Sequence, residues 1–122
     1  MPRSSILILA IAMLACGSCA PPATAAPTPI AGAPEVVVVA TEMRFTPGQI
    51  KVPAAAVNVT LKNEGSLPHD LTVPTLGVYI VAQPGQSVTV GLRDLPKATQ
   101  AGWCGIQGHR AAGMQMDVFV GE

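Results

Sequence analysis

Three residues in the C-terminal part of the sequence have side chains that bind soft metal ions. Cys104, His109 and Met114 lie in the segment GWCGIQGHRAAGMQM, with four residues between each pair of neighbours. Soft sulfur ligands combined with imidazole favour copper, and a trigonal plane of one Cys and two His under a long axial Met is typical of copper sites that transfer electrons. This spacing therefore predicts a copper site that still lacks one imidazole.

The missing imidazole has one source, because His69 is the only other histidine in the chain. If no other candidate ligands were present, a histidine on an apolar face would more simply be interpreted as a core residue than as a metal ligand. Pro68 forces the preceding residue into an extended conformation, after which His69, Leu71 and Val73 share one face of a predicted strand. Because the chain also holds the Cys–His–Met segment, we predict that His69 is a metal ligand.

The two segments, NEGSLPHDLTV and GWCGIQGHRAAGMQM, together resemble the small bacterial cupredoxins of the plastocyanin, azurin and auracyanin family. In that family an upstream histidine follows an Asn-rich turn, and the other ligands lie on one loop near the C-terminus. The resemblance covers roughly residues 35–122 and implies one type 1 copper ion. Its implied ligands are His69, Cys104, His109 and Met114.

The resemblance also separates the two methionines that could be the axial ligand. Ala112, Gly113 and Met114 resemble the family's Ala-Gly-Met turn, so Met114 is preferred, and Met116 is expected to fill the core. In relatives with this loop length, two backbone amides approach the thiolate, and the matching positions here are Asp70 and Ile106. Relatives often carry Asn in place of Asp70, so hydrogen bonding between the two loops could differ here.

Short alternating segments predict an all-β fold. Apolar and polar residues alternate in residues 57–62, 87–92 and 114–120, with turn residues between the segments. The valine-rich run in residues 35–40 lacks alternation, which suggests a strand covered on both faces or an ambiguous register. Residues 43–53 are interpreted as a turn into a second strand. We predict a Greek-key, cupredoxin-like β-sandwich of seven or eight strands.

The composition limits the possible functions. A chain of 122 residues predicts one small domain. Charged residues make up 11%, and seven Lys and Arg balance seven Asp and Glu. Without a basic surface, nucleic-acid binding is not expected.

The first residues predict export. Arg3 precedes an apolar run, residues 6–15, which is too short to cross a bilayer and has the length of a signal-peptide core. The run ends at Cys16 in a sequence similar to a bacterial lipobox, so we predict a signal peptide over 1–15 and a lipid on Cys16. A cut after Ala25, which would release a soluble protein, is the alternative. The expected location is periplasmic or otherwise extracytoplasmic, with the lipid in a bacterial membrane.

The next segment, residues 16–34, contains five prolines and no charged residue. It is predicted to be a disordered tether, although tolerated low-complexity sequence fits equally well. The copper-binding domain is then assigned to residues 35–122.

The predicted function is one-electron transfer between redox proteins outside the cytoplasm, by a monomer that is not an enzyme. Partners are expected to dock weakly beside His109, on a small apolar patch. The patch residues are Gly65, Leu67, Pro68, Gly108, Ala111 and Ala112.

Other functions remain open at this point. A copper carrier or storage protein would use the same ligands. A Cys104 nucleophile with a histidine base is a weaker hypothesis, because Met114 would then have no role. A structural zinc site is disfavoured because thioether is a poor zinc ligand.

Overall fold

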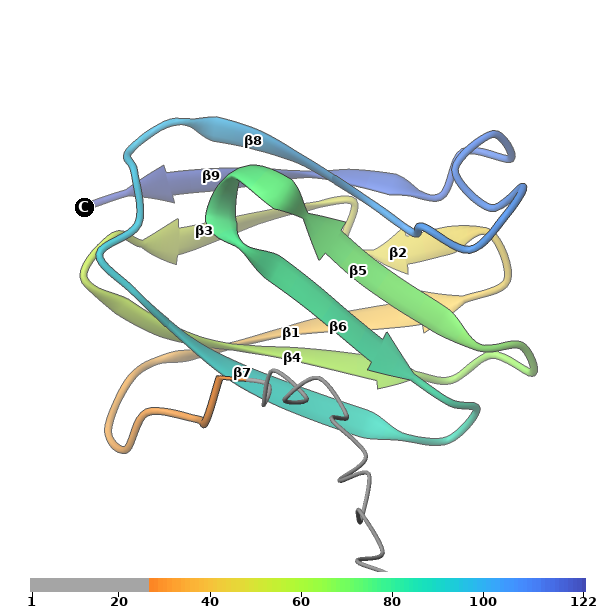
Figure 1. Ribbon diagram of the computed structural model, residues 1–122, viewed down its shortest axis with the longest axis horizontal. Helices are drawn as coiled ribbons and strands as arrows, with labels where there is room; N and C mark the ends of the chain where they lie inside the picture. Colours follow the sequence, from red (N-terminus) through yellow and green to blue (C-terminus); the bar gives the residue numbers. More distant parts are fainter. Residues whose placement is uncertain (1–26) are drawn as a thin grey trace, which may run out of the picture.

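Alternating burial along short strands builds two β-sheets that face each other (Figure 1). The computed structural model describes residues 27–122. Val57, Val59 and Leu61 of one strand are almost fully buried, while Lys62 beside them is exposed. The elements are β1 (Glu35–Thr41), β2 (Arg44–Thr46), β3 (Gln49–Pro53), β4 (Ala56–Asn63), β5 (His69–Val73), the 3-10 helix η1 (Pro74–Leu76), β6 (Val78–Ala82), β7 (Ser87–Arg93), β8 (Thr99–Trp103) and β9 (Gln115–Gly121).

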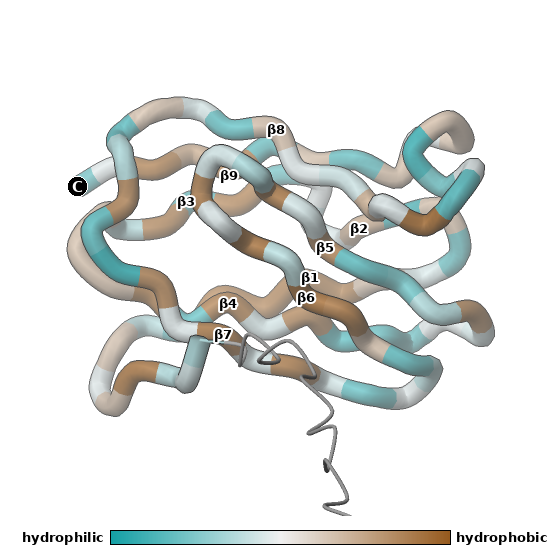
Figure 2. Tube along the Cα trace, viewed as in Figure 1, coloured by the Kyte–Doolittle hydropathy of each residue, from teal (hydrophilic) through white to brown (hydrophobic). Residues whose placement is uncertain are grey.

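The two sheets have the strand orders β2-β1-β4-β7 and β3-β9-β8-β5-β6. The pairs β1–β4 and β3–β9 are parallel, and the other paired strands are antiparallel. Hydrophobic residues recur along strands of both sheets (Figure 2), and Leu61, Leu71 and Ile80 are among the largest fully buried side chains between them. The core therefore lies between the sheets, and the loops gather at the two ends of the sandwich.

The predicted all-β, cupredoxin-like sandwich is confirmed, with two differences in detail. The described residues form nine strands, because residues 43–53 contain two strands, β2 and β3, that belong to different sheets. The interpretation of residues 35–40 as a strand covered on both faces was wrong, because Val37 is 42% exposed while Val38 is fully buried. The register of β1 comes from its parallel pairing with β4, in which Val38 lies opposite Leu61.

The segment before β1, residues 27–34, packs against the first sheet. The side chain of Asn58 accepts a hydrogen bond from the Ile30 amide at 2.7 Å and donates one to the Ile30 carbonyl at 2.8 Å. The segment also crosses Gly91, where a Cβ would lie 2.5 Å from the Thr28 carbonyl oxygen and 2.7 Å from Ile30 Cγ1. This part of the predicted tether is therefore fixed to the sheet, in contrast to our expectation.

The predicted signal peptide and the candidate lipid site Cys16 lie outside the described residues. Within residues 27–122, no helix has the length and hydrophobicity needed to cross a bilayer.

Replacing Asn58 with Ala should release the segment 27–34 from β4. The loss of two partly buried hydrogen bonds should lower the free energy of unfolding by about 1–2 kcal/mol, measured by chemical denaturation. The amide of Ile30 should exchange with solvent faster. The same substitution in a protein that begins at Glu35 is the control and should have a smaller effect, and equal effects in both proteins would contradict the contact.

Candidate metal centre

His69 is the first residue of β5 and follows a turn that the side chain of Asn63 holds in place. The Asn63 amide group donates hydrogen bonds to the carbonyls of Leu67 and Ala82, at 2.8 and 2.9 Å, and its oxygen accepts one from the Gly65 amide at 2.9 Å. His69 also pairs with Ala82 of the neighbouring strand β6. These contacts fix the backbone of His69 at one end of the sandwich.

The other candidate ligands lie on the loop between β8 and β9, at the same end of the molecule (Figure 1). The Cys104 amide donates to the Met114 carbonyl at 3.0 Å, which continues the β8–β9 pairing into the loop. Within the loop, the amides of His109 and Met114 donate to the carbonyls of Ile106 and His109, at 3.0 and 3.1 Å. This tight loop brings Cys104, His109 and Met114 close together in backbone position.

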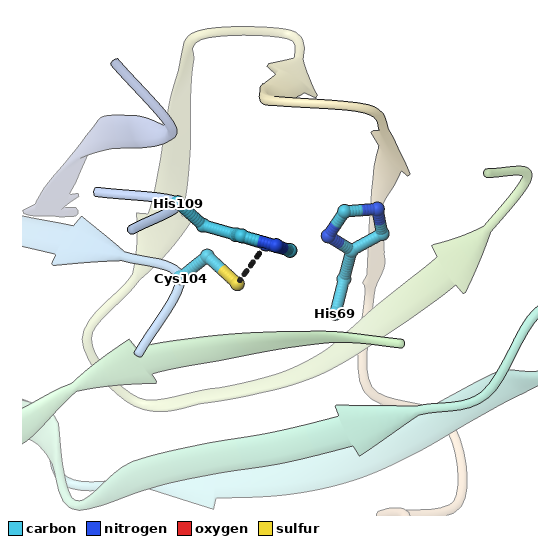
Figure 3. A group of neighbouring side chains, drawn as sticks. All are labelled: His69, Cys104 and His109. Carbon is cyan, nitrogen blue, oxygen red and sulfur yellow. Dashed lines mark hydrogen bonds between the residues drawn. The ribbon is translucent and has the colours of Figure 1, made fainter. Parts of the chain in front are cut away.

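Three of the four predicted ligands form one cluster. Ligand atoms of His69, Cys104 and His109 all lie within 4.8 Å of one another. The Sγ atom of Cys104 is 3.5 Å from His109 Nδ1, and the two imidazole rings have centroids 5.1 Å apart. In Figure 3 one ring nitrogen of His69 faces Cys104 and His109, and the other faces away from them. The relative exposures are 0% for His69, 0% for Cys104 and 7% for His109.

The fourth predicted ligand, Met114, is fully buried and begins the return from the loop. Met116 is also buried, but it lies on β9 opposite Gly102 of β8, and a Cβ on Gly102 would be 3.3 Å from its Cγ. Met116 therefore packs between strands. Of the two methionines, Met114 has its backbone hydrogen bonded directly to both Cys104 and His109.

Backbone amides surround the thiol as expected at two positions. The Asp70 amide donates to Cys104 Sγ at 3.4 Å. Burial raises the pKa of the Cys104 thiol above its usual value, and hydrogen bonds from the amides of Asp70 and Ile106 oppose this increase. Burial lowers the pKa of His69, so this imidazole is neutral at pH 7.

The carboxylate of Asp70 joins the two loops that carry the candidate ligands. Its Oδ1 accepts hydrogen bonds from the Gly105 amide at 2.6 Å and from the Thr72 hydroxyl at 3.0 Å. The contact between the two ligand-bearing segments is therefore made by a buried carboxylate.

A copper ion fits this group of residues on two observations. Among the described residues, neither ring nitrogen of the fully buried His69 has a hydrogen-bond partner, and burying such a group without a partner is unfavourable. The donors that converge here are a thiol and two imidazoles, which suit copper.

Sequence reasoning missed two contacts at this end of the sandwich. Glu42, in the turn between β1 and β2, places Oε1 at 3.8 Å from His69 Nε2. Arg110 stacks on Trp103, with Cζ 3.8 Å from the centre of the ring system. Both contacts join residues from different turns or strands, and no spacing pattern in the sequence indicates them.

A family model described as the cupredoxin-like domain matches residues 6–115. The chain belongs to the cupredoxin-like family. No curated protein sequence gives a significant match to this cupredoxin.

Solved structures with the same fold include auracyanins and domains of terminal oxidases. Auracyanin from Roseiflexus castenholzii has 18% identity and a TM-score of 0.64, over 75% of this chain and all of that one. Auracyanin A, a "blue" copper protein from Chloroflexus aurantiacus, has 15% identity and a TM-score of 0.56, over 71% and 99%. The periplasmic domain of cytochrome oxidase subunit II from Bradyrhizobium japonicum has 16% identity and a TM-score of 0.60, over 72% and 83%. Identities this low establish the shared fold alone.

The raised pKa of Cys104 predicts that metal binding is coupled to loss of a proton. At pH 8 the metal-free thiol is protonated, whereas a metal-bound thiol is deprotonated, so copper(II) binding should release about one proton from Cys104. Titration calorimetry in buffers with different ionisation enthalpies measures this number. A Cys104→Ser variant is the control and should lose this proton release. Proton release by the variant equal to that of the wild type would contradict the assignment.

Proposed function

We propose that this cupredoxin is a type 1 copper protein that carries single electrons between redox partners outside the cytoplasm. Its copper ligands would be His69, Cys104, His109 and Met114. The observation that carries the proposal is the buried cluster of His69, Cys104 and His109, in which donors from two distant segments converge within 4.8 Å.

Bound copper would supply the one-electron couple, and the residues of the chain would hold its surroundings constant. His69 is fixed on a strand whose turn is tied by Asn63, and Cys104 is fixed through the Met114 carbonyl and the Asp70 amide. Donors held by such contacts before metal binding move little when the charge at the site changes. A small rearrangement is the condition for fast electron transfer.

Electron transfer is favoured over copper carriage by the same geometry. The three clustered donors are at most 7% exposed, so an ion held there would be shielded from exchange with solvent or with a copper-carrying protein. The structural relatives include a protein described as a "blue" copper protein.

The docking surface would be the apolar patch beside His109. Leu67 is 41% exposed, and Pro68, Gly108, Ala111 and Ala112 are exposed on the two loops that flank the histidine. Small apolar patches of this kind suit brief contacts between redox proteins. The cytochrome oxidase subunit II domain among the structural relatives is consistent with redox proteins as partners.

Export would place the protein where such partners lie. The proposed arrangement is a signal peptide over 1–15, a lipid on Cys16 and a tether that leads to the domain over 35–122. A soluble form cut after Ala25 is the alternative, and mass spectrometry of the mature N-terminus distinguishes the two.

The copper-loaded, oxidised protein should have the intense visible absorption of a thiolate-to-copper transition. Cys104→Ser should remove this absorption, because a hydroxyl cannot replace the thiolate as a soft donor. Cys19→Ser makes the same chemical change outside the described residues and should leave the spectrum unchanged. A Cys104→Ser protein that keeps the band would refute the ligand set.

The two methionines should respond differently to substitution. Met114→Gln should keep copper and lower the reduction potential, because an amide oxygen is a harder donor that favours Cu(II). A tenfold change in the ratio of the two copper affinities corresponds to about 59 mV for one electron, and we expect a decrease of at least this size.

Met116→Gln is the matched control, since it places the same amide on β9. It should mainly lower the free energy of unfolding, by about 1–3 kcal/mol, because a polar group enters the core. Protein-film voltammetry gives the potential and chemical denaturation gives the stability. Equal potential shifts for both variants would contradict the choice of Met114.

A further inference from the structure

The turn between β1 and β2 places a carboxylate beside the buried imidazole of His69. Glu42 Oε1 accepts hydrogen bonds from the amides of Ser66 and Leu67, at 2.5 and 3.3 Å, and from the Ser66 hydroxyl at 3.3 Å. A residue from one turn is thus held against the loop that precedes His69. The carboxylate is fixed by the backbone of that loop and is half-exposed on its outer side.

The loop is shaped to let this carboxylate approach. Gly65 lies between Glu42 and His69, and a Cβ built there would overlap Glu42 Oε1 and lie 3.0 Å from His69 Nε2. Any larger residue at this position would push the carboxylate away from the imidazole. The absence of a side chain at Gly65 therefore keeps the distance between Oε1 and Nε2 at 3.8 Å.

His69 has two ring nitrogens with different surroundings. Nε2 is the nitrogen near Glu42, and in Figure 3 the nitrogen next to the ring's attachment point, Nδ1, faces Cys104 and His109. Within residues 27–122, neither nitrogen has a hydrogen-bond partner at hydrogen-bond distance. A neutral imidazole carries one proton, and only the nitrogen without it has a lone pair for a metal.

We propose that Glu42 is a positioning residue that keeps the proton of His69 on Nε2, so that Nδ1 is left free to bind the metal. This inference rests on the proposed copper site and adds a residue to it. A proton on Nε2 points toward a negative charge, whereas a proton on Nδ1 would point toward the thiol and imidazole of the cluster. A histidine that binds a metal usually donates its other N–H group to a carboxylate, carbonyl or water, which fixes its tautomer and orientation.

The charge of Glu42 has a second consequence for the metal. A carboxylate close to a ligand stabilises the more positive oxidation state, so Glu42 should favour Cu(II) over Cu(I). The hydrogen bonds from Ser66 and Leu67 lower the pKa of Glu42, so the carboxylate keeps its charge at neutral pH.

The first measurement uses the metal-free protein. Nitrogen-15 spectra of the imidazole should show His69 with Nε2 protonated and Nδ1 unprotonated in the wild type. Glu42→Ala removes the acceptor and should give a mixture of the two tautomers. Glu42→Gln keeps an oxygen that can accept the Ser66 and Leu67 amides, so it separates the effect of charge from a loss of loop structure.

The second measurement is the reduction potential of the copper-loaded protein. Glu42→Gln should shift the ratio of Cu(II) to Cu(I) affinity by about threefold or more toward Cu(I), which raises the potential by about 28 mV or more. Glu64→Gln is the matched control. Glu64 lies in the same loop, is 48% exposed and pairs with Lys62 at 2.7 Å, so its substitution removes the same charge from a carboxylate that is paired with a lysine.

The outcomes separate this inference from the proposed function. A wild-type His69 protonated on Nδ1, or equal potential shifts for Glu42→Gln and Glu64→Gln, would overturn the role of Glu42 and leave the copper site intact. A protein that binds no copper would overturn the proposed function, and the spectra of the metal-free protein would still decide the tautomer.

Discussion

The burial of nitrogen and sulfur donors with few partners is the constraint on which this structure depends. His69 and Cys104 are fully buried, and the ring of His69 has no hydrogen bond to any of the residues described. An unsatisfied buried polar group costs roughly 1–3 kcal/mol, so the surrounding sandwich must stabilise an arrangement that is unfavourable in the metal-free chain. The pairing of β5 with β6 and β8, and the hydrogen bonds of Asn63, oppose local rearrangement that would expose the imidazole.

Two carboxylates stand close to the donor residues, and the backbone holds both of them. Asp70 accepts a hydrogen bond from the Gly105 amide, and Glu42 accepts hydrogen bonds from the amides of Ser66 and Leu67. Amides in loops of this kind are fixed dipoles, which need little reorientation when a nearby charge changes. The electrostatic environment of the cluster is therefore built from groups that keep their positions, and this agrees with a function that needs a small rearrangement for each electron.

Much of this site could be predicted from residue types and alternation. The proximity of Cys104 and His109 follows from one short loop, and the inward orientation of His69 follows from its alternation with Leu71 and Val73. The parallel pairs β1–β4 and β3–β9 could not be predicted, because they join strands distant in sequence and have no turn signal. The same reason explains Glu42, which meets His69 only because β1 ends beside the loop that follows β4. The Pro-rich composition of residues 27–34 favours a free linker, but the Asn58 side chain accepts one hydrogen bond from Ile30 and donates one to it, and no pattern in the sequence indicates this contact.

The contact of residues 27–34 with the first sheet would also set the direction from which an anchored domain is held. Pro27 accepts a hydrogen bond from Gly91, and Gly91 lies opposite Asn58, near the start of β4. The loop that leads to His69, in contrast, begins where β4 ends. A tether attached at that point would hold the sandwich by the face of its first sheet. The end of the sandwich that bears His109 would then lie away from the tether. A tethered molecule could present this end to a partner by rotating as a rigid body.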